Sequence, residues 1–135
     1  MKIMNFVPPL ALVGCLTACS AIGPIPRDRL AANMAPILEI EKRFNQVRYY
    51  TQTLSSLGWI SEEKWEELKP HYDIYYVYYL ASSIHLAKGE MKSYLAHVQM
   101  AEKELDVIEA ILKDELAKGQ ERDSGRKREF SGSNL

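Results

Sequence analysis

The sequence predicts an all-α fold, a small bundle of three or four helices whose last two helices form an antiparallel hairpin. Apolar residues recur at three- and four-residue steps along several long segments, which is the pattern of amphipathic helices. Glycines and prolines separate these segments. With 47% hydrophobic and 26% charged residues, the chain has the composition of a folded domain and not of a disordered one.

The first 18 residues have the features of a signal peptide. Lys2 precedes an apolar run, residues 6–18. This run of about 13 residues is shorter than the roughly 20 that cross a hydrocarbon core. Pro8 and Pro9 also oppose a continuous spanning helix. We therefore leave residues 1–18 out of the fold prediction.

The tetrapeptide Leu16-Thr17-Ala18-Cys19 resembles the lipobox of bacterial lipoproteins. The resemblance implies cleavage before Cys19, a diacylglyceryl thioether on its sulfur and an acyl group on its amino nitrogen; no other cofactor is expected. Several acyl chains anchor a protein stably, whereas one does so only marginally. The tetrapeptide that ends at Cys15 also fits the motif. Cleavage there would leave a very short apolar run, so Cys19 is favoured.

The residue after Cys19 is Ser20 and not Asp. In a Gram-negative lipoprotein, this resemblance implies the outer membrane, facing the periplasm. We therefore expect a membrane-anchored protein of the cell envelope. Residues 19–26 contain one glycine and two prolines and are predicted to form a lipidated tether. The seven residues from 20 to 26 span about 25 Å at most, at roughly 3.3–3.6 Å per residue.

The head domain is predicted to span residues 27–118 and to begin with a helix. Pro36 is expected to divide this segment into a short first turn from Arg27 and a main helix. Gly58 is expected to end the main helix. The residues expected to share its buried face are Leu30, Ile37, Ile40, Phe44, Val47 and Leu54.

A second helix is predicted over residues 59–69, and Ser61 is a suitable N-cap for it. Glu62 and Glu63 then lie at the positive end of the helix dipole. Pro70 is expected to end this helix or to kink it into the next.

Residues 71–88 form a tyrosine-rich segment. The branched and aromatic residues 74–80 would also suit a β-strand, but without clean alternation a helix is favoured. A helical projection predicts a core-facing arc of Tyr72, Tyr76, Val77, Tyr79, Leu80, Ile84 and Leu86. The opposite side is predicted to be a partner-binding face of His71, Tyr75, Tyr78, Ser82 and His85, because tyrosines are favoured at protein interfaces. In the alternative, the N-terminal helix covers this side.

A last helix is predicted from Glu90, after a break at Gly89, to about Lys118, with Gly119 ending it. Its coiled-coil-like core positions are Met91, Tyr94, Val98, Ala101, Leu105, Ile108 and Leu112, widened by Leu95 and Leu116. Residues 85–105 loosely resemble one tetratricopeptide hairpin, of which no second copy is visible. The polar residues 119–135 are predicted to be a disordered tail.

The sequence contains no recognisable combination of catalytic residues, and the protein is not expected to be an enzyme. Of the two cysteines, Cys15 lies in the signal segment and Cys19 is expected to carry lipid, so no disulfide can stabilise the head. The three histidines lack the spacing of a metal site, and His85 and His97 lie at unequal distances from Gly89, so they need not meet. The mature charge of −2, from 16 basic and 18 acidic residues, gives no support to nucleic-acid binding.

The predicted function is therefore that of a non-enzymatic binding or assembly accessory, held at the membrane and bound to an envelope protein. In size and helical character the chain is similar to the small helical pilot and accessory lipoproteins of secretion machines. The alternative is an exclusion or inhibitor lipoprotein of a mobile element. A more distant alternative is a helical bundle that binds a small ligand.

Overall fold

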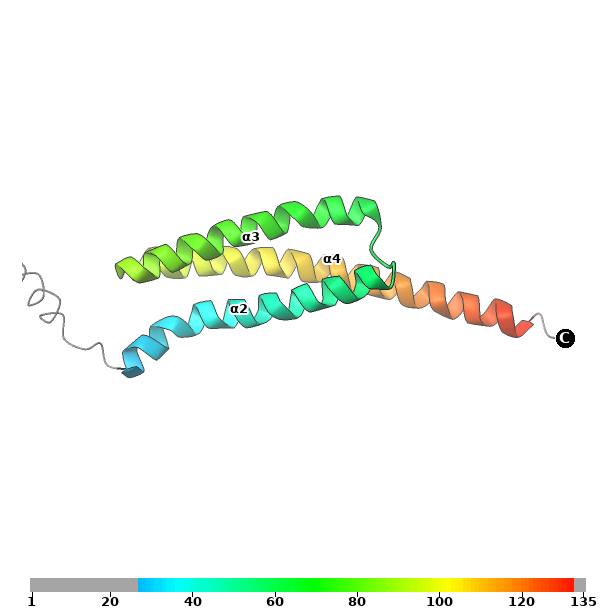
Figure 1. The fold of residues 1–135 in the computed structure, drawn as a ribbon, viewed down its shortest axis with the longest axis horizontal. Coiled ribbons are helices and arrows are strands. Elements are labelled where there is room, and N and C mark those ends of the chain that lie inside the picture. The colour runs from blue at the N-terminus through cyan, green and yellow to red at the C-terminus, as the bar shows by residue number, and fades with distance from the viewer. Residues whose placement is uncertain (1–26, 133–135) are drawn as a thin grey trace, which may run out of the picture. The chain divides into compact units, whose positions relative to one another are not determined.

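The computed structural model describes residues 27–132, which form three helices and no strand. They are α2 (Arg27–Ser56), α3 (Glu62–Lys88) and α4 (Met91–Gly132) (Figure 1). The all-α prediction is thus confirmed. The lipobox, both cysteines of the chain and the tether lie outside the described residues. The chain divides into two compact units after Asn33, and the first unit contributes only the opening turns of α2 to the described part.

In the second unit the three helices form an antiparallel bundle. The chain runs up α2, back along α3 and forward again along α4 (Figure 1). Side-chain contacts join α2 to the hairpin of α3 and α4. Among them, the ring of Phe44 stacks on Tyr75, Tyr79 donates to Glu41, and Arg43 pairs with the acidic side chains of α4. The predicted antiparallel hairpin of the last two helices is confirmed.

Both turns of the bundle depend on a glycine with positive φ. Gly58 has φ 68°, and the N–H of Trp59 donates to the carbonyl of Leu54 at 2.9 Å. Gly89 has φ 73°, and the N–H of Glu90 donates to the carbonyl of His85 at the same distance. These bonds satisfy carbonyls that each helix end leaves free, and only glycine adopts this conformation without strain. Both predicted helix ends are confirmed.

The start of α3 also follows the prediction. The N–H of Lys64 donates to Ser61 Oγ at 3.3 Å, so Ser61 is the N-cap. Glu62 and Glu63 occupy the first turn, where the helix dipole favours a negative charge.

Neither proline ends a helix, which corrects the boundary predicted at Pro36 and excludes a helix end as one of the two alternatives at Pro70. Pro36 lies inside α2 and Pro70 lies inside α3, so four predicted segments form two helices. A proline removes one backbone hydrogen bond and distorts the turn before it. Next to Pro36, the N–H of Ile37 donates to the buried hydroxyl of Tyr94 at 3.1 Å. Tertiary packing thus supplies a partner at the disturbed turn and keeps α2 continuous.

The end of α4 differs from the prediction as well. The helix passes through Gly119 and continues to Gly132, so the prediction of a disordered tail from residue 119 is wrong for residues 119–132. Residues 121–129 are exposed and rest on no core. A helix that extends an existing helix pays no nucleation penalty, and Gln, Glu, Arg and Lys are good helix formers.

Gly119 is a packing site and not a helix end. Its backbone faces the indole of Trp59, and a Cβ built on Gly119 would lie 2.3 Å from both Cδ2 and Cε3 of that ring. The absence of a side chain therefore lets the loop between α2 and α3 lie directly on α4. Arg122 also reaches this loop, because its Nη2 donates to the carbonyl of Trp59 at 3.4 Å.

The core of the bundle confirms most of the buried positions predicted on α2 and α4. Leu30, Leu95 and Leu116 were expected in it, but they remain 46%, 43% and 38% exposed. The buried hydrophobic residues are Ile37, Ile40, Phe44, Val47, Leu54, Ile60, Leu68, Tyr75, Tyr94, Val98, Ala101, Leu105, Ile108 and Leu112.

We predict that Gly119→Ala lowers stability by about 1–3 kcal/mol, because the new methyl group overlaps the indole of Trp59. Gly125→Ala is the matched control in the same helix. No atom lies within 4 Å of a Cβ at Gly125, so this change should stabilise the protein by about 0.5–1 kcal/mol through helix propensity. Urea unfolding followed by circular dichroism measures both. Equal effects of the two substitutions would show that Trp59 does not pack on Gly119.

Candidate functional site

The predicted partner-binding face of α3 is turned toward the other two helices. Tyr75 is 1% exposed and Ser82 is fully buried. The ring of Tyr75 lies parallel to that of Phe44 on α2, with centroids 4.4 Å apart. Tyr75 and Ser82 are therefore not free to bind a partner, and the alternative, that the N-terminal helix covers this side, describes Tyr75.

The other members of that predicted face contact α4. His71 Nδ1 lies 2.7 Å from Glu104 Oε2, and the ring of Tyr78 lies 6.2 Å from that of His97. His85 stacks on His97 with ring centroids 4.9 Å apart, so these two histidines do meet across the hairpin. The five residues are therefore positions of the helix interface, three of them half-buried at its edge.

Polar atoms on this interface have partners inside the bundle. Ser82 Oγ donates to the carbonyl of Tyr79 at 2.7 Å, which lets a serine be buried without loss. Tyr72 Oη lies 2.5 Å from Thr51 Oγ1, and Tyr79 Oη donates to Glu41 Oε1 at 2.5 Å. Each tyrosine thus places its ring against the core and its hydroxyl on a partner at the edge.

The pKa values of two tyrosine hydroxyls, Tyr75 and Tyr79, are raised furthest above the ordinary value. The hydrogen bond from Tyr79 to Glu41, with burial adding to it, raises the pKa of Tyr79 to about 12. Burial, together with the negative charge of Glu41, raises the pKa of Tyr75 well above its usual value. Both rings therefore remain neutral at physiological pH, as their packed positions require.

The opposite side of α3 is exposed and apolar. Tyr76, Val77, Leu80 and Ile84 are 47%, 63%, 58% and 53% exposed. We call these four residues the outer face of α3. They were predicted to lie in the core, and that prediction is wrong. Of the same predicted arc, only Tyr72, Tyr79 and Leu86 pack against the core.

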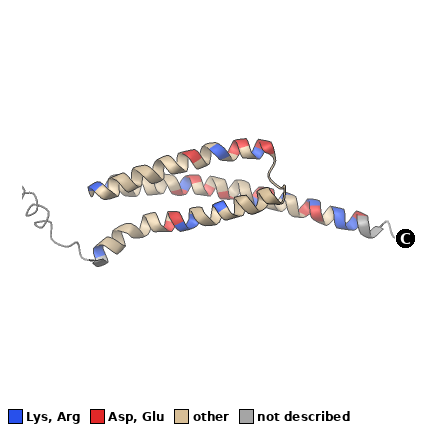
Figure 2. Ribbon diagram, viewed as in Figure 1, with Lys and Arg blue, Asp and Glu red and all other residues tan. Residues whose placement is uncertain are grey.

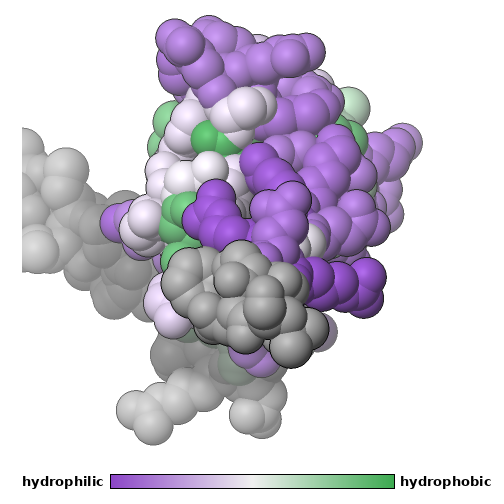
Figure 3. All heavy atoms as spheres, turned by 90° about the vertical axis from the view of Figure 1, so that its right-hand side faces the viewer, coloured by the Kyte–Doolittle hydropathy of each residue, from purple (hydrophilic) through white to green (hydrophobic). Residues whose placement is uncertain are grey.

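The outer face belongs to a stretch of α3 without any charged residue. Asp73 precedes this stretch and Lys88 follows it, and the 14 residues from 74 to 87 include no Asp, Glu, Lys or Arg. Figure 2 shows it as the tan part of α3 that ends in a blue turn. The end of the molecule where α3 begins is mainly hydrophilic on the face that Figure 3 shows. The outer face is therefore confined to one half of α3.

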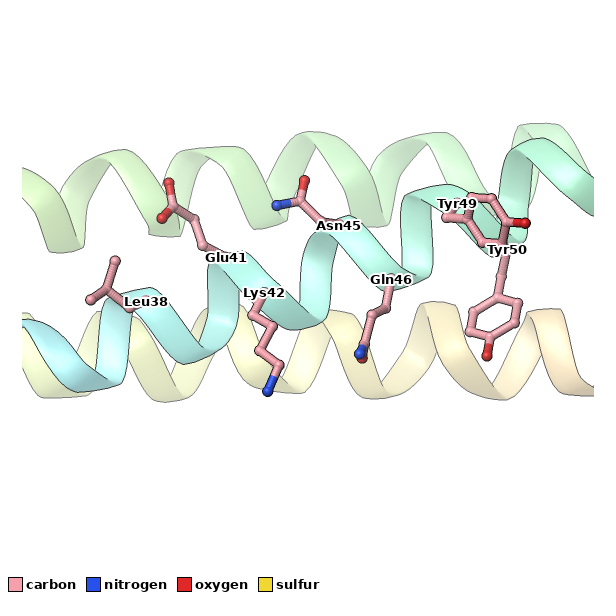
Figure 4. A pocket seen from close by; sticks show the side chains of 7 residues that line it. All are labelled: Leu38, Glu41, Lys42, Asn45, Gln46, Tyr49 and Tyr50. Carbon is pink, nitrogen blue, oxygen red and sulfur yellow. The ribbon is translucent and has the colours of Figure 1, made fainter.

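Two hollows lie elsewhere on the described surface. The first, of about 690 Å³, is lined only by side chains of α2, around Tyr49 and Tyr50, and it lies open on that helix (Figure 4). The second, of about 640 Å³, is an apolar groove between α2 and α4. Its lining includes Tyr50, Leu54, Leu57, Trp59, Leu112 and Leu116.

Two further features of the described residues bear on the site. Within residues 27–132, no group of three or more His, Cys, Asp or Glu side chains is placed to hold a metal ion. No helix in the same range combines the length and the apolarity that a membrane crossing requires.

No family model, curated protein or solved structure matches this chain.

We predict that Tyr75→Ala lowers the free energy of unfolding by about 3–5 kcal/mol, because it removes a fully buried ring that stacks on Phe44. Val77→Ala, on the outer face of the same helix, is the matched control and should change stability by no more than about 0.5 kcal/mol. Thermal and urea unfolding measure both. A larger loss from Val77→Ala than from Tyr75→Ala would mean that α3 packs through its other side.

Proposed function

We propose that this protein is a membrane-tethered, non-enzymatic binding or assembly accessory of the cell envelope. Its lipidated Cys19 is the anchor, and the outer face of α3 is the docking surface. This assignment replaces the predicted face of His71, Tyr75, Tyr78, Ser82 and His85, which the bundle itself uses.

The observation that carries the proposal is the exposure of four large apolar side chains between residues 76 and 84 of one helix. Scattered exposed apolar residues are normal on a soluble domain, but a contiguous group without charge marks an interaction surface. Depletion of charge at the centre, with aromatic residues present, is the composition of an interface core. The outer face has both properties, because Tyr76 is aromatic and residues 74–87 are uncharged.

The bundle is well suited to present such a face. The neighbouring Tyr75 is locked by Phe44, and Tyr76 lies edge-on to the same Phe44 ring with centroids 5.2 Å apart. The docking residues are therefore held on a rigid helix, so little conformational freedom is lost on binding. A tether of seven residues would hold this head within about 25 Å of the lipid surface.

We expect that Cys19→Ser abolishes both labelling by an alkyne analogue of palmitate and recovery of the protein in the membrane fraction. Cys15→Ser is the matched control and should leave both unchanged, because Cys15 lies in the part of the chain that is removed. Expression in a bacterial host and fractionation with click labelling give the readout. If Cys15→Ser instead abolishes the labelling, the lipid is attached to Cys15 and not to Cys19.

The docking surface is tested by a photo-crosslinking amino acid at Val77 or Leu80 in the full-length protein in cells. We expect adducts with a defined envelope protein or with the protein itself, and none from the exposed position Gln99 on α4. Val77→Asp should reduce adduct formation at Leu80 about tenfold, because it places a charge in the apolar contact. Equal labelling from Leu80 and Gln99, unaffected by Val77→Asp, would overturn the proposal.

A further inference from the structure

We propose that the partner of the outer face is a second copy of the same chain, paired helix to helix with α3 antiparallel about a two-fold axis. This inference rests on the proposed function, because it names the occupant of the same face. The axis passes between Leu80 and Ala81.

Two of the four outer-face residues, Val77 and Ile84, exchange places about that point, and Leu80 lies next to it, whereas Tyr76 has no counterpart on the outer face. Val77 stands three residues before Leu80, and Ile84 stands three residues after Ala81. In an antiparallel pair, Val77 of one copy therefore lies opposite Ile84 of the other, and the two copies of Leu80 meet near the axis. Isologous contact requires a patch that complements itself in this way.

The two ends of the face carry opposite charges at positions that are related by the same axis. Asp73 stands seven residues before Leu80, and Lys88 stands seven residues after Ala81. Both are exposed, and on a helix with 100° per residue both fall on the side of the apolar stripe. An antiparallel pair brings Asp73 next to Lys88 of the other copy at both ends. A parallel pair would instead bring Asp73 to Asp73 and Lys88 to Lys88.

The spacing of the apolar residues suits a helix as the occupant. Val77, Leu80, Ile84 and Ala87 follow the three-four-three steps of a coiled-coil seam. In such seams, flanking charges set the orientation of the two helices, which is the role that we assign to Asp73 and Lys88.

A lipid surface suits the same face less well. The outer side of α3 carries Asp73 and Lys88, and toward its N-terminus Glu66 pairs with Lys69 at 2.5 Å, so it offers no net positive charge to attract an anionic membrane. The pair of opposite end charges has no counterpart in a uniform lipid layer. A matching helix with reversed direction does provide one.

The contact is small, since the stretch of α3 from Asp73 to Lys88 is about 24 Å long at roughly 1.5 Å per residue. Interfaces of this size are transient and not obligate. We therefore expect association at micromolar concentration in solution, and a larger dimer fraction where a membrane concentrates the protein.

The test uses the full-length protein in cells, with Leu80→Cys and a short bismaleimide crosslinker. We expect a crosslinked dimer, and at most background from Gln99→Cys. The unsubstituted chain measures any product formed through Cys15 or Cys19. In the Leu80→Cys background, Asp73→Lys or Lys88→Asp alone should reduce the dimer about fivefold, because like charges then meet at both ends. The double reversal should restore it to within about twofold.

Rescue by the double reversal supports the antiparallel pair, because a general loss of folding would not be reversed. Its absence, or a dimer yield from Leu80→Cys no higher than from Gln99→Cys, overturns self-association. If the photo-crosslinker at Leu80 then captures a different envelope protein and Val77→Asp abolishes that adduct, the proposed function stands without the dimer. If it captures nothing, both proposals fail.

Discussion

The stacking of Phe44 on Tyr75 fixes which side of α3 faces the bundle, and the rest of the arrangement follows from it. The two rings are parallel within 3°. With Tyr75 inside, Leu68 and Ser82, one heptad before and after it, are also buried. The same rotation about the helix axis places Tyr76 at the edge and Leu80 in solvent. The core and the candidate docking surface are thus two consequences of one contact.

The sequence predicted the helices and their glycine turns because these depend on local chemistry. Gly58 and Gly89 each end a helix through a conformation that disfavours other residues, and Ser61 caps the next helix directly. The buried positions of α4 were also predictable, because its apolar stripe is interrupted by no proline. Gly119 was misread, since the sequence alone does not show that a tryptophan 60 residues earlier packs on its backbone.

The rotation of α3 was missed because the segment was divided at Pro70. Seen as one helix, Glu62–Lys88, it carries two apolar stripes of unequal length. The inner stripe runs from Leu68 through Tyr75 and Ser82 and extends over most of the helix. The outer stripe continues toward the N-terminus as exposed Glu66 and Asp73. A helix buries the side that is apolar along most of its length. The longer inner stripe therefore indicated which side of α3 is buried.

This difference in length is also the basis on which we propose a partner for the outer stripe. The inner stripe with α2 and α4 completes the core, and no buried side-chain nitrogen or oxygen of the described residues lacks a hydrogen bond. Folding of the bundle therefore does not require Val77, Leu80 and Ile84. Their exposed apolar side chains lower the solubility of the protein. A polar surface at these positions would fold equally well. Four apolar side chains between one acidic and one basic residue are instead suited to recognising a helix that approaches in the opposite direction.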